Sequence, residues 1–479
     1  MRRPPFLCIQ EFGRTFVKKG LLVLFLLLCS KLHPLSLSLE DAERIALGEN
    51  QPYLISQEEV YQADQQRLGA YSKWMPQISY NSFFAHTFEP TLVENINTGT
   101  FFYKKNLVMN RFEMNQTIFS SDLLYNIKKK TLEKKSTEER GRGKKNDLLL
   151  NVRGAYFSAL LFEKAVQIQK ENVNYLKSAL EVETGKYQAG NATLLETNQS
   201  KVAVSNAISQ YYNTLKQLKV SKNALVKALG IDPHLGGDIQ ITEDDFPIYE
   251  KPLLSNKLNQ ISLKNVSAQN IEFGEEKELS LFSDAQLDDF ISQAIKEKPD
   301  LQSYKTNVNI AEKTVSESYG KYLPEVTAFV DYQKNAGEPS SRLFSKDPFS
   351  WAAGIKISWD IFDGLLRERK IKEAVSKRSS SKLRYKYALN QVEIEVRDVL
   401  SGIEDALYSY VFASESVKVA EMAAKQAREK LSFGKIPPLD YRDAVNQLAQ
   451  AKNLKNRSSF QVIMAYYQLR YDIGIDANN

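Results

Sequence analysis

Large apolar residues alternate with small or polar ones over the segment 350–362. Trp351 and Ile355 fall on one parity, whereas Gly354 and Lys356 fall on the other. A period of two predicts a β-strand with one apolar face. This pattern is typical of a barrel wall between lipid and water, and a half-buried strand of a soluble sandwich would produce it as well.

Three further segments carry the same alternation less sharply. The four strands are predicted at about 77–88, 107–119, 325–333 and 350–362, with loops at 89–106 and 334–348. Pro76 and Pro324 stand just before the first strand of each pair, where they end a preceding helical pattern because proline does not continue a helix. The strands are therefore expected as two hairpins.

Helical spacing extends over unusual lengths after each hairpin. Helices are predicted at about 120–187, 193–229, 365–433 and 439–471, and shorter ones at about 39–71 and 284–319. At 1.5 Å per residue, the two longest would each measure roughly 100 Å. Globular helices average about 11–12 residues, so these need neighbours along their whole length to bury their apolar stripes.

The two halves of the chain repeat each other. The segment around Pro76 returns 248 residues later around Pro324, and Gly190 returns 244 residues later as Gly434. A repeat of this length indicates a duplicated structural unit of helix, strand, strand, long helix and helix. The predicted organisation is a first repeat at 39–230, a linker or equatorial segment at 231–285 and a second repeat at 286–479.

Residues 1–38 are predicted to be a secretory signal peptide. Basic residues precede the apolar run Leu21–Leu28, which is about half the length that a membrane span needs. Cys8 and Cys29, the chain's two cysteines, both lie in this leader. The mature chain is therefore expected to have no disulfides, and lipid attachment at Cys29 is an alternative that the sequence leaves open.

Charge and residue types exclude several function classes. The leader holds six basic residues and one acidic residue, so the formal charge of +6 falls to about +1 without it. A nearly neutral chain lacks the basic excess of a nucleic-acid binder. His86 and His234 have no partner at the spacing of a metal site or a catalytic triad. We therefore expect no enzyme activity, no catalytic residue, no metal site and no cofactor.

Four strands with one apolar face cannot close on themselves, because a closed cylinder needs about eight. Three chains would supply twelve strands, and the same three chains would bring twelve long helices together. The sequence thus predicts a symmetric oligomer that combines a membrane β-barrel with a long α-helical barrel.

The chain resembles the TolC-type outer-membrane efflux proteins over essentially everything from Leu39 to about Ile475. Three segments carry the resemblance: Lys73-Trp74-Met75-Pro76-Gln77-Ile78 with its copy around Pro324, Trp359-Asp360-Ile361-Phe362-Asp363-Gly364 through Arg367, and Phe433-Gly434 followed by Leu439-Asp440. No single motif is decisive, but their duplicated order is specific.

The resemblance implies a homotrimer with a 12-stranded β-barrel in the outer membrane and a 12-helix α-barrel extending into the periplasm. It implies a passive exit duct for efflux or type I secretion, driven by an inner-membrane pump through a periplasmic adaptor. Helix tips around Gly190 and Gly434 would dock the adaptor. The cargo is not implied, because the pump selects it.

By the same resemblance, acidic residues after the tip glycine ring the periplasmic aperture. The matching positions are Asp440 and Asp443, with Glu196 as the charge kept in the first repeat. A ring of carboxylates favours cations and can bind a blocking metal ion. The alternative is that aspartates in a first helical turn only complement the helix dipole. Ile436 stands where members of the family carry a basic locking residue, which leaves the closing contacts open.

A second function class is an exported coiled-coil scaffold or adaptor of the periplasm. It would account for the long helices and the leader. It would not account for one-sided aromatic strands between long helices in both repeats.

Overall fold

The computed structural model describes residues 35–86, 106–232, 239–263, 281–336, 349–433 and 435–477. Most of the predicted leader, most of the two predicted loops, His234 and Gly434 lie outside them. The chain divides into two compact units. We name the first the helical unit (Met1–Gln51, Leu148–Leu281, Val399–Gln468) and the second the sheet unit (Pro52–Asp147, Phe282–Asp398, Leu469–Asn479).

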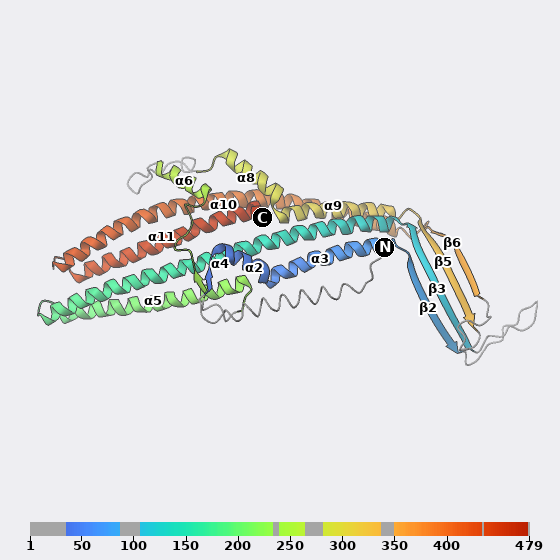
Figure 1. Ribbon diagram of the computed structural model, residues 1–479. Helices are drawn as coiled ribbons and strands as arrows, with labels where there is room; N and C mark the ends of the chain where they lie inside the picture. The colour runs from blue at the N-terminus through green and yellow to red at the C-terminus, as the bar shows by residue number, and fades with distance from the viewer. Residues whose placement is uncertain are drawn as a thin grey trace, which may run out of the picture. The chain divides into compact units, whose positions relative to one another are not determined.

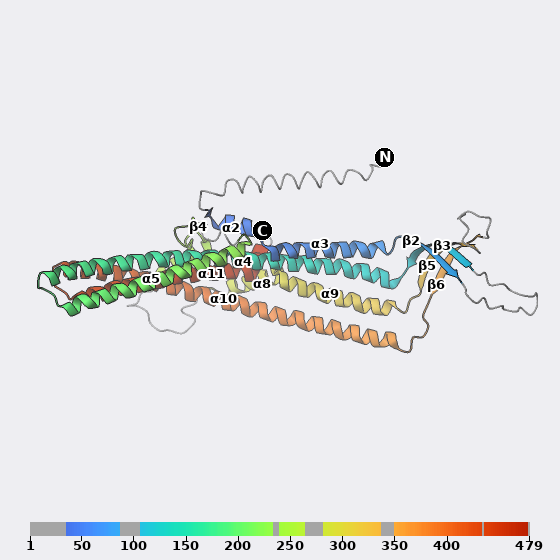
Figure 2. The same ribbon diagram turned by 90° about the horizontal axis from the view of Figure 1, so that it is seen from below.

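Four strands form one antiparallel sheet in the sheet unit (Figures 1 and 2). They are β2 (Gln77–His86), β3 (Asn106–Phe119), β5 (Glu325–Ala336) and β6 (Phe349–Ser358), in the order β2-β3-β5-β6. Each strand lies where the alternation predicted one, although β6 ends at Ser358, before Trp359. The β3–β5 pairing joins the first repeat to the second.

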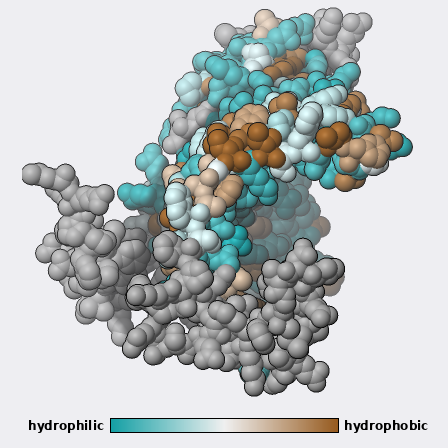
Figure 3. Space-filling model, turned by 90° about the vertical axis from the view of Figure 1, so that its right-hand side faces the viewer, coloured by the Kyte–Doolittle hydropathy of each residue, from teal (hydrophilic) through white to brown (hydrophobic). Residues whose placement is uncertain are grey.

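One face of this sheet is strongly apolar. Tyr80, Phe112, Tyr332 and Trp351 occupy one row across all four strands, and Ile78, Met114, Val330 and Ala353 occupy the next row. The Tyr80 and Phe112 ring centroids lie 4.5 Å apart, and those of Phe112 and Tyr332 lie 6.3 Å apart. Trp351 is 70% exposed. Figure 3 looks from the side on which the strands are drawn in Figure 1, and hydrophobic side chains gather in patches there.

The opposite face is polar. Arg111 on β3 bonds Glu113 at 2.7 Å and, across the strand pair, Asp331 on β5 at 2.8 Å. Gly354 of β6 stands opposite Phe329, whose ring covers the position that a glycine leaves empty. Alternation of side chains between the two faces of a strand produces this division.

A tight turn connects β6 to the helix α10 (Leu366–Ser432). Asp363 accepts hydrogen bonds from the backbone N–H groups of Leu366 (3.2 Å) and Arg367 (3.1 Å), so it caps the helix. Gly364 and Leu365 both have positive φ, at 72° and 67°. Arg367 donates to the Ile361 carbonyl at 3.0 Å, which folds the segment back on itself. These contacts give Asp363, Gly364 and Arg367 a structural role in the turn between β6 and α10.

Two helix pairs contain the longest elements of the described chain. α4 (Ser121–Gln188) has 68 residues and α10 has 67, and each is followed by a 36-residue helix, α5 (Leu194–Leu229) or α11 (Pro438–Ile473). At 1.5 Å per residue, α4 and α10 are roughly 100 Å long. A search of the described helices finds no segment with the length and apolarity of a membrane span.

The helical unit has its core where α4 meets α11. Phe157 stacks on Tyr467 with centroids 5.8 Å apart and meets Phe246 at 6.0 Å. Beside them a parallel pair forms between β1 (Leu35–Leu37) and β4 (Ile239–Ile241). Tyr156 donates to the carbonyl of Leu37, a fully buried residue, at 3.0 Å. A leader ending at residue 38 would remove this strand.

The structure also holds elements that the sequence pattern did not predict. Within the predicted linker 231–285 lie β4 and the helix α6 (Pro252–Leu263). The helices predicted at about 39–71 and 284–319 are each broken. The first is α2 (Leu39–Glu49) and α3 (Gln51–Ser72), and the second is α8 (Asp284–Glu297) and α9 (Pro299–Gly320). Prolines at or next to the start of α3 and α9 explain the breaks, because proline fits only the first turn of a helix.

Candidate functional site

The turn that joins α4 to α5 is built by a glycine and a capping box. Gly190 has φ +76°, and the N–H of Asn191 bonds the Lys186 carbonyl at 2.8 Å, which closes the end of α4. No atom lies within 4 Å of a β-carbon placed on Gly190. This exposed turn is the position at which the sequence predicted adaptor docking. Its counterpart Gly434 lies outside the described residues.

Glu196 serves the cap of α5. Its carboxylate accepts from the backbone N–H of Thr193 at 2.8 Å and from the Thr193 hydroxyl at 2.9 Å. The backbone hydrogen bond, followed by the hydroxyl, lowers the pKa of Glu196. This carboxylate therefore stabilises the start of α5. That role explains why a glutamate stands here, whether or not it lines a pore.

Asp440 and Asp443 lie at the start of α11, three residues apart and both exposed. Asp443 pairs with the neighbouring Arg442 at 3.3 Å and lines a large groove, whereas Asp440 does not line it. The structure thus brings one of the three predicted constriction residues to a cavity wall.

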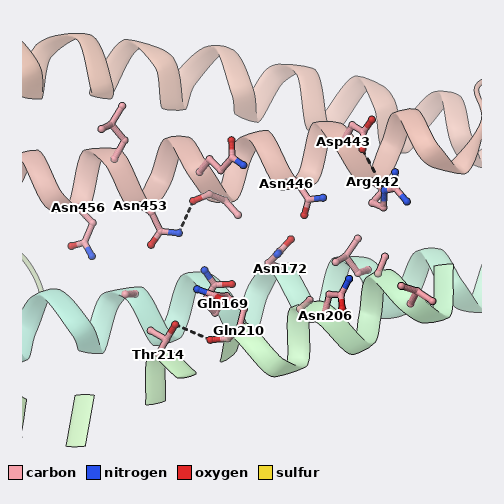
Figure 4. Close-up of a pocket in the computed structure, with 18 of the residues that line it drawn as sticks. Gln169, Asn172, Asn206, Gln210, Thr214, Arg442, Asp443, Asn446, Asn453 and Asn456 are labelled. Atoms are coloured by element: carbon pink, nitrogen blue, oxygen red, sulfur yellow. Dashed lines mark hydrogen bonds and ion pairs between the residues drawn. The ribbon is translucent and has the colours of Figure 1, made fainter. Parts of the chain in front are cut away.

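That groove has a volume of about 1320 Å³ and runs between α4, α5 and α11 within the helical unit (Figure 4). Its wall is rich in amide side chains: Gln169, Asn172, Asn198, Gln199, Asn206, Gln210, Gln217, Asn446, Gln450, Asn453 and Asn456. We call it the amide groove. Figure 4 shows Asn446, Asn453 and Asn456 directed from α11 toward the amides of α4 and α5.

Apolar contacts behind the amides hold the walls together. Val173 and Leu176 of α4 pack on Val204 and Ala207 of α5. A second cluster joins Ala179 of α4 to Leu431, Tyr441 and Val445 of α10 and α11. Lys452 bridges α11 to Glu171 of α4 at 2.9 Å.

Charged residues are few in the lining of the amide groove. Arg442, Asp443 and Arg457 are its charged lining residues. None of the charged residues of α5 lines it, although that helix carries six of them: Glu196, Lys201, Lys216, Lys219, Lys222 and Lys227. The residues Gln199, Asn206, Gln210 and Gln217 recur at intervals of seven, four and seven, which is one face of a helix. The charged residues of α5 therefore lie off the face that lines the groove.

Two buried amides in this groove have an oxygen without a partner. Asn172 is 8% exposed and Asn456 is 7% exposed, and the Oδ1 atom of each accepts no hydrogen bond from the described residues. Asn456 uses its Nδ2 to bond the Leu161 carbonyl at 2.8 Å. Sequence reasoning overlooked these residues because amides match no catalytic or metal motif. The available signal was the recurrence of amides at intervals of four and seven along α5 and of three and four along α11.

The remaining chemical candidates do not assemble into a site. His86 ends β2, and the described residues contain no group of histidine, cysteine and acidic side chains that could hold a metal ion.

Comparison with known proteins places these features in context. The model of the outer membrane efflux protein family matches residues 56–231 and 290–474. The alkaline protease secretion protein AprF of Pseudomonas aeruginosa is 19% identical over 366 residues, covering 76% of this chain and 68% of that protein.

Two solved structures share the fold. A membrane protein from Pseudomonas aeruginosa superimposes with a TM-score of 0.72 at 16% identity, covering 91% of this chain and 90% of the other. The Campylobacter jejuni outer membrane channel CmeC gives a TM-score of 0.70 at 16% identity, covering 91% and 85%.

Proposed function

Since this chain belongs to the outer membrane efflux protein family, we propose that three copies close into one continuous duct. The family consists of outer-membrane channels for efflux or secretion rather than enzymes, and they work with an adaptor and an inner-membrane pump. The family match sets aside the periplasmic scaffold. The proposal adds the assembly: a 12-stranded β-barrel in the outer membrane joined to a 12-helix barrel that extends into the periplasm.

The four-stranded sheet is the observation that supports this assembly. β2 and β6 each pair with one neighbouring strand, so each leaves a row of backbone donors and acceptors unpaired along its outer edge. In hydrocarbon an unpaired backbone group costs several kcal/mol, so an open sheet is not stable there. The apolar face through Tyr80 and Trp351 would contact lipid, and the face with Arg111 and Asp331 would line water.

Cysteine pairs across the new edge test the closure. Asn81→Cys on β2 is combined in turn with Ala352→Cys, Gly354→Cys and Lys356→Cys on β6, whose side chains share the polar face. Oxidation of a closed ring should link three subunits covalently in at least one combination. The single-cysteine variants are the controls, since they cannot link three chains.

Two outcomes would contradict the assembly. One is a crosslink that forms only within a single subunit. The other is a mature protein that stays monomeric in water without detergent, which would return the scaffold to consideration.

The helix ends around Gly190 and Gly434 would form the periplasmic end of the transport path. We place the adaptor at the turns of Gly190 and Gly434 and the constriction at Asp440 and Asp443. Glu196 contributes least, because Thr193 already holds its carboxylate. The relative AprF is named for secretion of a protease, whereas CmeC is described as an outer membrane channel. Both kinds of duct are compatible with these features.

A further inference from the structure

We infer that the amide groove binds the main chain of an extended polypeptide, which is then the cargo class of the duct. This inference rests on the proposed trimer and on the groove facing its interior. It is carried by the amide chemistry of the wall, by the absence of the charged residues of α5 from it and by its length.

A side-chain amide presents the same groups as a peptide bond. Asparagine and glutamine each offer an N–H donor and a carbonyl acceptor, so they match main-chain groups of any sequence. In the groove, Asn206 and Gln210 of α5 are exposed to solvent, as is Gln450 of α11. They are free to exchange water for a peptide group, and such an exchange is weak enough per contact to permit movement.

The low net charge of the wall, +1 from Arg442, Arg457 and Asp443, suits a ligand whose side chains vary. A secreted polypeptide carries both signs of charge, and a charged wall would hold one sign and repel the other. Lys216 and Lys219 lie on the same helix as Gln210 and Gln217, yet they face away from the groove.

The groove is long rather than round. On α5 its lining runs from Leu195 to Gln217 and on α11 from Leu439 to Arg457. At 1.5 Å per residue these stretches measure roughly 30 Å. An extended chain of about nine residues covers that distance. Small-molecule sites are instead mostly apolar concavities with a few placed polar groups.

Current block in planar bilayers tests the inference. The reconstituted trimer is exposed to an uncharged peptide of glycine and serine of about 20 residues, roughly twice the groove length. We expect discrete blocking events. Versions of the peptide that carry two lysines or two glutamates should block with dwell times within about threefold of the neutral one, because the charged lining residues Arg442, Arg457 and Asp443 sum to only +1.

Variants then assign the block to the groove. The triple change Asn206→Leu, Gln210→Leu and Gln217→Leu should shorten the dwell time about tenfold or more, since three hydrogen bonds are lost. Asn213→Leu is the matched control, because this exposed amide lies on the same helix and does not line the groove. Gln210→Glu keeps the shape of the side chain and should make the block depend on the charge of the peptide. This variant still tests the inference if the leucine variant fails to assemble.

Each outcome separates this inference from the proposed function. A conducting trimer that peptides do not block, or whose block is unchanged in both groove variants, overturns the inference and leaves the duct intact. If a neutral dextran blocks equally and its block is lost in the same variants, the wall is a general hydrated surface and the inference is overturned. Absence of any conducting trimer removes the duct and the inference together.

Discussion

Gly230 lies directly against the backbone of Asn50, at the break between α2 and α3. A β-carbon on Gly230 would come within 2.7 Å of the Asn50 Cα, and the glycine has φ +77°. Asn50 in turn donates from Nδ2 to the Ala228 carbonyl at 2.9 Å. The second repeat has the same arrangement: a β-carbon placed on Gly474 would come within 2.9 Å of the Lys298 Cα. In each repeat, the end of the last long helix therefore packs closely against the break between two shorter helices.

Gly230→Ala should destabilise the protein by about 2 kcal/mol or more, because it combines a backbone clash with a left-handed conformation. Thermal unfolding of the purified protein in detergent measures the loss. Gly185→Ala is the matched control: it lies inside α4 with nothing near its β-carbon position, and alanine favours helix there. Equal stability of the two variants would show that the Asn50 contact yields without cost.

The double change Asp440→Asn and Asp443→Asn should reduce cation selectivity and block by divalent cations in planar bilayers. Removing the carboxylates takes negative charge from the predicted aperture. Glu196→Gln should leave selectivity nearly unchanged and weaken the start of α5, because its carboxylate is engaged by Thr193. Selectivity that is the same in all three proteins would place Asp440 and Asp443 outside the pore.

Glu183 is 2% exposed on α4, and burial raises the pKa of its carboxyl group. Because the folded-state pKa is raised, charging this carboxyl group destabilises the folded protein. This destabilisation is absent below the unfolded pKa near 4.5 and grows as the pH rises through the folded-state value. Glu183→Gln should therefore raise Tm at pH 7 by about 2–4 °C, with the gain vanishing near pH 4.

Differential scanning measurements at both pH values check this, with the exposed Glu181→Gln as the control on the same helix. A lower Tm in Glu183→Gln at pH 7 would contradict the expectation and would place a basic group of another copy beside the carboxylate.

The mature chain should begin before Leu35. Cleavage after residue 38 would remove the Leu37 carbonyl, which accepts from Tyr156 at 3.0 Å and from the Thr242 N–H at 3.1 Å. Intact-mass measurement of the purified protein locates the new N-terminus. A start at Leu39 would show that β1 is dispensable, and Tyr156→Phe should then be neutral rather than costing about 1 kcal/mol.

The strands were predictable from sequence because side-chain alternation has a strict period. The parity of Trp351 and Ile355 specifies which side chains share a face, and the register places Trp351 in the row of Tyr332 and Phe112. The long helices were predictable from the absence of proline. The breaks at Asn50 and Lys298 were missed, although Pro52 and Pro299 mark helix starts.

The amide groove could not be predicted in the same way. Asn172, Gln210 and Asn456 are far apart in sequence, and only the packing of three helices brings them together. The pairing of β1 with β4 depends on a contact across about 200 residues, for which three-residue strands give no periodic signal.

The free edges of β2 and β6 also bear on biogenesis. A lone subunit that has folded this sheet in water carries two templates for strand addition, and any other exposed strand can dock on them. Insertion into the bilayer and ring closure are therefore expected to be coupled, so that subunits accumulate either as escorted precursors or as aggregates. Yield in the cell should follow the supply of insertion machinery more closely than the rate of synthesis.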